Sequence, residues 1–360
     1  MLGLCLDSAP GVVGGTRGVC GMSLTLEILG QLSVADKVAA WGTLGTVKPH
    51  PGFEPEVDVE DLAEAIGEKG VQKDIIITDI VTGRNNSQRQ QIVTLFKTLV
   101  NEDLIQAMTV ALSGHLKDLI VGLLRCPAQY DALDLKGAMK GLGTDESTIT
   151  EILATRTNQQ LQEIRTVYKE EFKSTLENDI GQETSGEYKD LLLTLLKGTR
   201  EKNSGVIDYM QINQDAQVLG EVSKKNSRSA SQWISILSLR SQDHLSRVFE
   251  QYKTLTSLDV EESIQKHFKG DFQKGLLTLA STIKNTPLFF ADKLYTSMKG
   301  LGTKESTVNR IMISRSETDL LSIRAEFRKK FGKSLYSMIE SNTSGEYLTA
   351  LLSLCRAEDL

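Results

Sequence analysis

The stretch that decides the fold is MKGLGTDES at residues 139–147, which the chain repeats almost unchanged as MKGLGTKES at residues 298–306. Two glycines one residue apart, followed by a polar run, describe a tight loop that leads into a helix. Such a loop can turn backbone carbonyls outward, and carbonyls together with one carboxylate are ligands that a hard cation such as calcium accepts. The recurrence of the loop therefore predicts an internal repeat and suggests calcium sites.

Two further markers measure the period of this repeat. The first is a glycine in a recurring local pattern, at Gly114, Gly186, Gly270 and Gly345. The second is an arginine followed by two polar residues, at Arg84, Arg156, Arg240 and Arg315. Both series advance in steps of 72, 84 and 75 residues. Two markers in one register predict four units of about seventy residues.

The hydrophobic pattern within the units is helical. Apolar residues recur at three- and four-residue spacing over 58–67, 92–100, 148–154, 161–172 and 188–196. No segment between them alternates strongly enough to predict a strand. We therefore predict an all-α chain of four repeats with about five helices each, at residues 53–124, 125–196, 208–280 and 284–355. Residues 1–52 form an N-terminal tail with an amphipathic helix at 23–32, and residues 197–214 are expected to form a linker between two halves.

Composition and charge exclude several classes of protein. The net charge of −6 argues against a nucleic-acid binder, which needs a basic face. Four cysteines without a pattern favour a reducing intracellular setting. No apolar run approaches the roughly 20 residues that span a bilayer. The four histidines show no metal-ligand spacing, and the GKS at 332–334 lacks the first glycine of a phosphate loop, because Phe327 stands there. We expect a soluble protein that is not an enzyme.

From residue 53 to 355 the sequence resembles the annexin family. The family's repeat pairs a Met-Lys-Gly-x-Gly-Thr loop with an acidic residue some 39 positions after the threonine, and Glu183 follows Thr144 at that distance. The resemblance implies four five-helix repeats closed into a curved disc. It also implies that Ca²⁺ in the loops bridges the protein to acidic phospholipid headgroups, since an acidic protein needs a cation to approach an anionic leaflet.

The resemblance assigns the main calcium site to the second repeat, with carbonyl ligands from Met139, Gly141 and Gly143 and a bidentate carboxylate from Glu183. These supply five of the six to eight ligands that calcium takes, which leaves places for water or a lipid phosphate. Thr144 with Glu146 is a candidate minor site, although an acid in the first turn of a helix also serves the helix dipole. Thr303 with Glu305 repeats that pair in the fourth unit.

Three repeats depart from the family pattern. In the fourth, the carbonyls of Met298, Gly300 and Gly302 are kept, but Asn342 stands where the acid is expected, so we predict a weakened site. In the third, KKNSRS at 224–229 replaces the loop and His267 the acid, so this site is predicted to be lost. In the first, Ala111 takes the acid position and the main site is again absent.

The tail adds a candidate partner site. MSLTLEILGQL at 22–32 resembles the peptide with which calpactin-type annexins bind a small EF-hand dimer, although Thr25 replaces an apolar residue of that peptide. Its predicted partner-binding face consists of Leu24, Ile28, Leu29 and Leu32. The competing interpretation is that this helix packs on its own core or stays disordered. The actin cytoskeleton is a further partner that the resemblance implies.

These observations predict calcium-dependent binding to acidic phospholipid membranes, in membrane organisation or trafficking, with a reduced calcium response. The expected location is the cytoplasm, peripheral on the plasma membrane or endosomes, with the extracellular surface as an alternative. The alternative function is an all-α scaffold with degenerate calcium sites that acts through protein partners.

Overall fold

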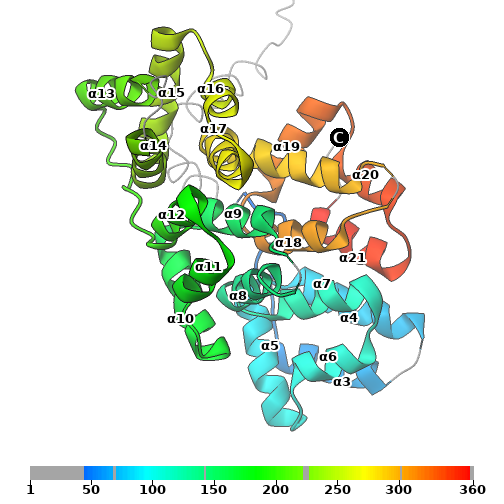
Figure 1. The fold of residues 1–360 in the computed structure, drawn as a ribbon. Helices are drawn as coiled ribbons and strands as arrows, with labels where there is room; N and C mark the ends of the chain where they lie inside the picture. The colour runs from blue at the N-terminus through cyan, green and yellow to red at the C-terminus, as the bar shows by residue number, and fades with distance from the viewer. Residues whose placement is uncertain (1–43, 68–69, 142, 222–226, 301, 357–360) are drawn as a thin grey trace, which may run out of the picture. The chain divides into compact units, whose positions relative to one another are not determined.

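A computed structural model describes residues 44–67, 70–141, 143–221, 227–300 and 302–356. These residues form helices joined by short connections, and no strand occurs among them (Figure 1). The prediction of an all-α chain of four repeats with about five helices each is confirmed. The predicted helix at 23–32 lies outside the described residues.

The helices follow one another in four similar sets. The first repeat contains α3 (Pro55–Gly67), α4 (Val71–Gly83), α5 (Asn86–Leu99), α6 (Leu104–Ala111) and α7 (Gly114–Leu124). The second contains α8 (Pro127–Ala138), α9 (Glu146–Thr155), α10 (Asn158–Phe172), α11 (Leu176–Glu183) and α12 (Gly186–Leu196). The third contains α13 (Tyr209–Gly220), α14 (Ser227–Leu239), α15 (Gln242–Thr256), α16 (Val260–His267) and the first part of α17 (Gly270–Met298). The fourth contains the rest of α17, then α18 (Glu305–Arg315), α19 (Leu320–Phe331), α20 (Leu335–Asn342) and α21 (Gly345–Cys355).

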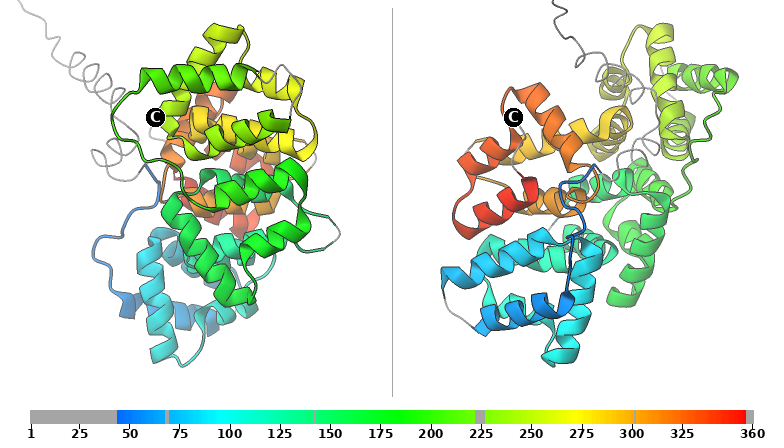
Figure 2. Two further views of the ribbon diagram at one scale, coloured as in Figure 1. Left: turned by 60° about the vertical axis from the view of Figure 1, so that its left-hand side comes forward. Right: turned by 180° about the vertical axis from the view of Figure 1, so that it is seen from behind.

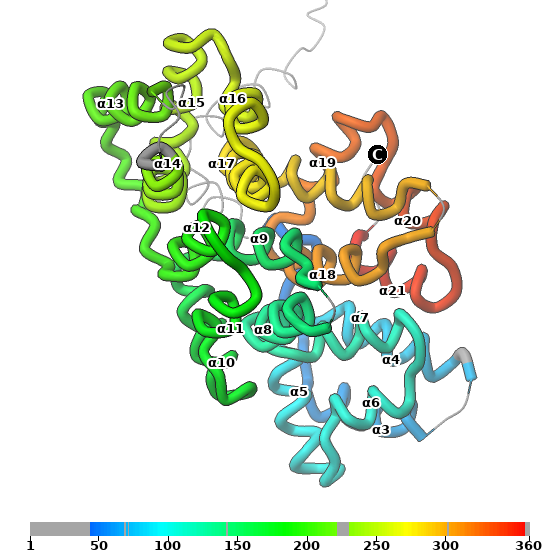
Figure 3. The backbone as a smooth tube through the Cα atoms, viewed as in Figure 1, coloured from blue at the N-terminus to red at the C-terminus, as the bar shows by residue number. Residues whose placement is uncertain are grey.

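The connections between repeats differ. Through α17 the chain passes from the third repeat to the fourth without a loop, but Asn285 has non-helical φ and ψ of −160° and 93°, and Pro287 follows (Figure 3). A proline inside a helix removes a hydrogen bond and kinks it. The predicted linker at 197–214 is too long, because α13 begins at Tyr209. The Asp208 side chain accepts the N–H of Gln211 at 2.9 Å, and this N-cap starts the helix inside the charged stretch.

The recurring arginine contacts the first helix of its own repeat. In the first three repeats it forms a two-pronged ion pair with an aspartate about 25 residues earlier, with N···O distances of 2.6–3.3 Å, in the pairs Arg84–Asp58, Arg156–Asp131 and Arg240–Asp215. In the fourth repeat Phe290 stands in place of the aspartate. Arg315 lies over its ring, 4.8 Å from the centroid, and pairs with Asp319 instead. The marker therefore reports a structural tie within each repeat.

The recurring glycine also has a local cause. Gly114, Gly186, Gly270 and Gly345 each open the last helix of a repeat with φ between 58° and 65°. Side chains disfavour this left-handed conformation, so glycine is the residue that enters these helices without strain.

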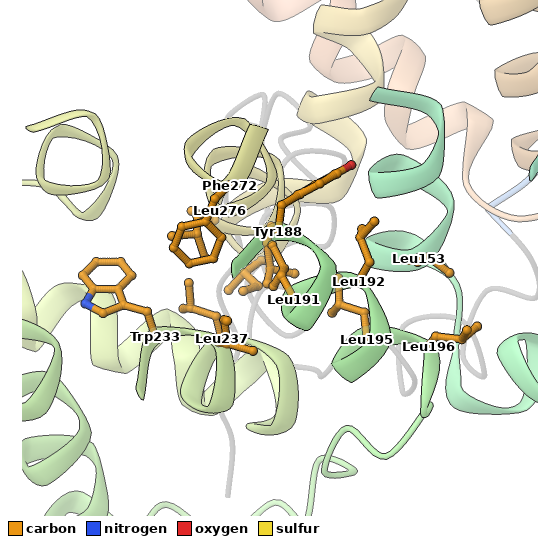
Figure 4. Close-up of a cluster of buried hydrophobic side chains, with 14 of the residues drawn as sticks. Leu153, Tyr188, Leu191, Leu192, Leu195, Leu196, Trp233, Leu237, Phe272 and Leu276 are labelled. Atoms are coloured by element: carbon orange, nitrogen blue, oxygen red, sulfur yellow. The ribbon is translucent and has the colours of Figure 1, made fainter. Parts of the chain in front are cut away.

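Two hydrophobic cores pair the repeats in a way that chain order does not show. One core consists of buried residues between 132 and 283, in the second and third repeats. The other takes its residues from 47–124 and 290–355, so the first and fourth repeats share it. The segment predicted as a linker between two halves therefore connects two repeats of the same half. In Figure 4, Trp233 and Leu237 of α14 lie with Tyr188 of α12 and Phe272 of α17 in the first core.

A buried ionic cluster lies where these two halves meet. Glu151 on α9 is fully buried, and its carboxylate accepts from Arg310 on α18 at 3.0 and 3.2 Å and from Lys293 on α17 at 2.5 Å. Asp134 on α8 lies 3.9 Å from Arg310. Burial raises the pKa of Asp134 to about 7, although the charge of Arg310 opposes the shift. Buried charged side chains thus contribute to the contact between the halves.

Residues 45–53 form a non-helical strap that ties the first repeat to the fourth (Figure 2). The N–H of Val47 donates to the carbonyl of Ser316 at 3.0 Å. Further along, the backbone of His50 exchanges two hydrogen bonds with the side chain of Gln88, at 2.9 and 3.1 Å. The strap therefore begins against the last repeat and ends against the first.

We expect Gly45→Ala to destabilise the protein by about 1–3 kcal/mol, the usual cost of overpacking. A Cβ at Gly45 would lie 2.4 Å from backbone atoms of Ser316 and Glu317, which cannot rotate aside. Urea unfolding measures the effect. Gly137→Ala is the matched control, because a Cβ there meets no atom within 4 Å and alanine favours a helix. Equal midpoints for Gly45→Ala and wild type would contradict the close packing of the strap.

Candidate functional site

The loop between α8 and α9 has the backbone shape that its paired glycines predict. Gly141 and Gly143 have φ of 110° and 103°, values that residues with side chains rarely adopt. The N–H of Asp145 donates to the carbonyl of Ala138 at 2.8 Å and closes the loop. Met139 is buried, whereas Gly141 and Gly143 are exposed. The loop is thus anchored by its methionine and presents its glycines to solvent.

Asp145, rather than Glu146, caps the helix that follows. Its carboxylate accepts the N–H of Thr148 at 3.1 Å and the hydroxyl of Thr148 at 2.7 Å. Glu146 is the first residue of α9, and its carbonyl accepts the hydroxyl of Tyr188 at 3.0 Å. Thr144 precedes the cap and is half-buried. The side chain of Glu146 is therefore not needed as a cap, and the minor site at Thr144 and Glu146 stays a prediction.

Glu183, the last residue of α11, combines exposure with the lack of a protein partner. Within the described chain its carboxylate makes no hydrogen bond or ion pair. One turn earlier, Asp179 is held by Lys136 at 2.8 Å, Tyr168 at 2.5 Å and Ser174 at 2.6 Å. Burial opposes ionisation, but these donors hold the pKa of Asp179 at about 2. Of the two acids, Glu183 is the one available to a cation.

Two contacts bring the end of α11 beside the loop. Lys136 in the last turn of α8 binds Asp179 of α11, and Tyr188 of α12 binds the first turn of α9. The first contact ties the last turn of α8 to α11 one turn before its end at Glu183. The last carbonyls of a helix lack intrahelical donors and carry partial negative charge, so two helix C-termini in one region favour a cation. Carbonyls of Met139, Gly141 and Gly143 with the Glu183 carboxylate would form an all-oxygen donor set of the kind that calcium takes.

The fourth repeat keeps the loop and loses the carboxylate. Lys304 donates its N–H to the carbonyl of Ser297 at 2.8 Å, the same closing bond as in the second repeat, and φ is 108° at Gly300 and 95° at Gly302. Asn342 ends α20, and its amide nitrogen donates to the carbonyl of Met338 at 2.7 Å. The loop shape matches that of the second repeat, a neutral side chain stands in place of the acid, and the weakened calcium site stays a prediction.

The two loops differ more in the formal charge around them than in backbone shape. Around the second-repeat loop stand one lysine and three carboxylates, a formal charge of −2, from Lys140, Asp145, Glu146 and Glu183. The corresponding positions of the fourth repeat hold two lysines and one carboxylate, a formal charge of +1, from Lys299, Lys304, Glu305 and Asn342. These formal charges favour a divalent cation at the second repeat over the fourth.

We expect Asn342→Glu to tighten calcium binding at the fourth repeat by about tenfold or more, because a carboxylate adds both charge and a second oxygen. Isothermal titration calorimetry of the purified chain with calcium measures this as an added or tightened site. Asn342→Gln is the control, since it changes length without charge. A calcium isotherm identical to wild type for Asn342→Glu would refute the donor assignment in this repeat.

The first and third repeats depart further from a calcium site. In the first, the ammonium of Lys73 donates to the carbonyl of Ala111 at 2.5 Å, so a fixed cation contacts the position equivalent to Glu183. In the third, residues 222–226 of the loop lie outside the described chain, and the ring of His267 contacts the carbonyl of Ser263 on its own helix, N to O 3.1 Å. Neither repeat places a carboxylate at the acid position.

The sequence analysis did not predict three hydrogen bonds that join the loop region of a repeat to the region of its acid position. Lys73 to Ala111, Thr150 to Tyr188 and Thr303 to Asn342 are contacts between residues 38 or 39 apart. This is the spacing that leads from the loop to the acid position, so the same spacing could have pointed to them. The predicted partner residues Leu24, Ile28, Leu29 and Leu32 lie outside the described residues, and their role stays a prediction.

The described residues hold no cluster of three or more His, Cys, Asp or Glu side chains fit for a metal ion. None of the described helices is both long and apolar enough to serve as a membrane span.

Comparison with known proteins agrees with this geometry. The annexin family model matches residues 57–123, 130–195, 214–279 and 289–354. The chain is 46% identical to annexin A9 of Mus musculus over 343 residues, 95% of this chain and 99% of the relative. The solved structure of annexin III has a TM-score of 0.85 at 41% identity, covering 88% of this chain and 98% of its own. A calcium-bound structure, annexin (Sm)1, has a TM-score of 0.78 at 28% identity, covering 86% and 92%.

Proposed function

The chain belongs to the annexin family, and on that premise we propose that it binds acidic phospholipid membranes through calcium held mainly by its second repeat. Annexins as a family bind calcium and bind such membranes in a calcium-dependent way. The proposal for this chain rests on Glu183, an exposed carboxylate at the end of α11 that has no partner among the described residues.

The residues of the second repeat have distinct roles in this proposal. The carbonyls of Met139, Gly141 and Gly143 and the carboxylate of Glu183 would hold the ion, and bound calcium supplies the positive charge that joins them to a lipid phosphate. Left-handed glycines hold the loop open without strain. The buried Met139 and the capping Asp145 fix its two ends. Because the whole chain carries −6, adsorption to an anionic leaflet depends on this added charge.

We further propose that the calcium response is smaller than that of an annexin with four complete sites. Three repeats lack the acid, with Ala111, His267 and Asn342 in its place. The proposed role is membrane organisation or trafficking, peripheral on the cytosolic face of the plasma membrane or endosomes. With one strong site, membrane binding depends mainly on the carboxylate of Glu183.

One observation supports a second candidate function, a scaffold that works through protein partners. The contact of Lys73 with the Ala111 carbonyl replaces a possible calcium contact by a permanent internal one. If internal contacts of this kind also replace calcium in the other repeats, the helical array keeps its shape without the ion. We favour the membrane function, because the second-repeat donor set is complete.

Co-sedimentation with phosphatidylserine vesicles across a calcium titration tests the proposal, with phosphatidylcholine vesicles and a chelator as controls. The membrane function predicts pelleting that requires both calcium and the acidic lipid. Pelleting that persists in chelator would indicate that basic loops, rather than bound calcium, contact the lipid. No pelleting at millimolar calcium would favour the scaffold.

A further inference from the structure

Where the first, second and fourth repeats meet, the structure contains a cavity of about 100 Å³. This is well above the roughly 10–15 Å³ that one water molecule requires. Four arginines and two carboxylates line it, a formal charge of +2, namely Arg89, Arg125, Arg156, Arg315, Asp131 and Glu317. We call this cavity the arginine pocket.

Two of the four guanidinium groups each form a two-pronged ion pair with a carboxylate of the protein. Arg156 binds Asp131 through two nitrogens, at 2.6 and 2.7 Å. Arg315 binds Asp319 through two nitrogens, at 2.7 and 2.6 Å. Such two-pronged pairs satisfy both charge and geometry. These two arginines shape the wall and need no further ligand.

Arg89 is not fully paired, although its exposed fraction is only 2%. Its Nε donates to the Val81 carbonyl at 2.7 Å, and its Nη1 donates to the Leu123 carbonyl at 3.3 Å and to Glu317 at 3.2 Å. Its Nη2 is buried and has no acceptor in the described chain. Burial lowers the pKa of Arg89 to about 10, although Glu317 acts in the opposite direction. The Glu317 carboxylate alone therefore does not compensate for the cost of burying the Arg89 guanidinium.

Two more donors in the wall lack acceptors. Arg125, half-buried between α7 and α8, makes no side-chain hydrogen bond or ion pair in the described chain. The hydroxyl of Ser314 is buried and has no partner there. A buried donor without an acceptor is unfavourable. Arg89, Arg125 and Ser314 all line the arginine pocket, so an oxyanion held there would lie among the three residues whose donors lack acceptors in the described chain.

We propose that the arginine pocket binds a small phosphate-type oxyanion, either inorganic phosphate or the phosphate group of a soluble metabolite. The planar fork of a guanidinium matches the oxygens of a phosphate. Helix α8 runs from Pro127 at the pocket to Ala138 at the calcium-type loop, about 18 Å for its 12 residues. The choice of a soluble ligand over a headgroup rests on the proposed function, because a bilayer at the loops would lie at the far end of this helix.

Calorimetric titration of the full chain with inorganic phosphate, in chelator and against sodium chloride of equal ionic strength, tests the proposal. We expect Arg125→Gln to weaken phosphate binding about tenfold or more. Arg165→Gln, which removes an arginine of α10 that pairs with Glu177 outside the pocket, should leave it unchanged. Binding is measured directly because phosphate also stabilises proteins without a site.

Ser314→Ala keeps the test independent of folding. Removal of an unpaired buried hydroxyl should leave the protein at least as stable as wild type, yet weaken phosphate binding several-fold. No phosphate binding by wild type, or equal binding by wild type, Arg125→Gln and Ser314→Ala, would overturn the proposal. Sedimentation with phosphatidic acid vesicles in chelator that Arg125→Gln abolishes, without binding of inorganic phosphate, would overturn the choice of a soluble ligand. No calcium enters the calorimetric assay, so its failure leaves the membrane function untouched.

Discussion

Glu183→Gln is expected to abolish calcium-dependent sedimentation with phosphatidylserine vesicles. The glutamine keeps the size of the side chain but removes its charge and leaves one neutral oxygen, the state that Asn342 already has in the fourth repeat. Calcium affinity depends on the number of charged ligands, so the loss at this site should exceed tenfold. Because the first, third and fourth repeats lack the acid, no equivalent site can replace it.

The matched control for this variant is Glu187→Gln. Glu187 is an exposed acid in the first turn of α12, four residues beyond Glu183. It changes the net charge by the same amount and should leave vesicle binding as in wild type. If both variants pellet with calcium like wild type, the second-repeat loop is not the membrane site. If both fail, net charge near the loop matters, rather than one ligand.

Arg310→Ala should lower the free energy of unfolding by about 3–5 kcal/mol, the usual cost of removing one partner from a buried ion pair. Glu151 is 0% exposed and Arg310 only 4% exposed. The variant leaves Glu151 with Lys293 as its remaining ion-pair partner in the described chain and takes the nearby cation from Asp134. Urea unfolding at neutral pH measures the loss. Arg165→Ala, which breaks a half-exposed pair with Glu177, should cost no more than about 1 kcal/mol.

The pH dependence of this loss distinguishes an ionic role from simple packing. Burial by itself would raise the pKa of Glu151, but Arg310 and Lys293 hold it below its ordinary value. A lowered pKa contributes stability above the unfolded pKa, near 4.5, and that contribution disappears as the pH falls through the folded value. The deficit of Arg310→Ala should therefore be largest at neutral pH and shrink in acid. A deficit of constant size from neutral to acid pH would mean that Arg310 acts through its packing alone.

The repeat, the helices and the shape of the second-repeat loop could be predicted from sequence because each depends on local chemistry. The step between marker glycines reflects a φ that favours glycine, and the paired glycines of the loop reflect the same restriction. Glu183 was proposed from its spacing to the loop, and its role as a calcium ligand stays a prediction. The end of the linker was placed wrongly because composition outweighed one capping residue, Asp208, which starts α13 at Tyr209.

By itself, the sequence determined that the chain is a helical array of four units and that the second unit alone pairs the double-glycine loop with an acid 39 residues after its threonine. Only the tertiary structure decided that the first repeat shares its core with the fourth and that a buried pair, Glu151 and Arg310, joins the halves. It also decided that Lys73 contacts the Ala111 carbonyl and that Arg89 and Arg125 line one cavity. The spacing of apolar residues reflects contacts between residues close in the chain. Contacts between distant residues, such as Glu151 and Arg310, which are 159 positions apart, depend on how the helices pack. A contact with a backbone carbonyl cannot be predicted from side-chain identity, because every residue has that carbonyl.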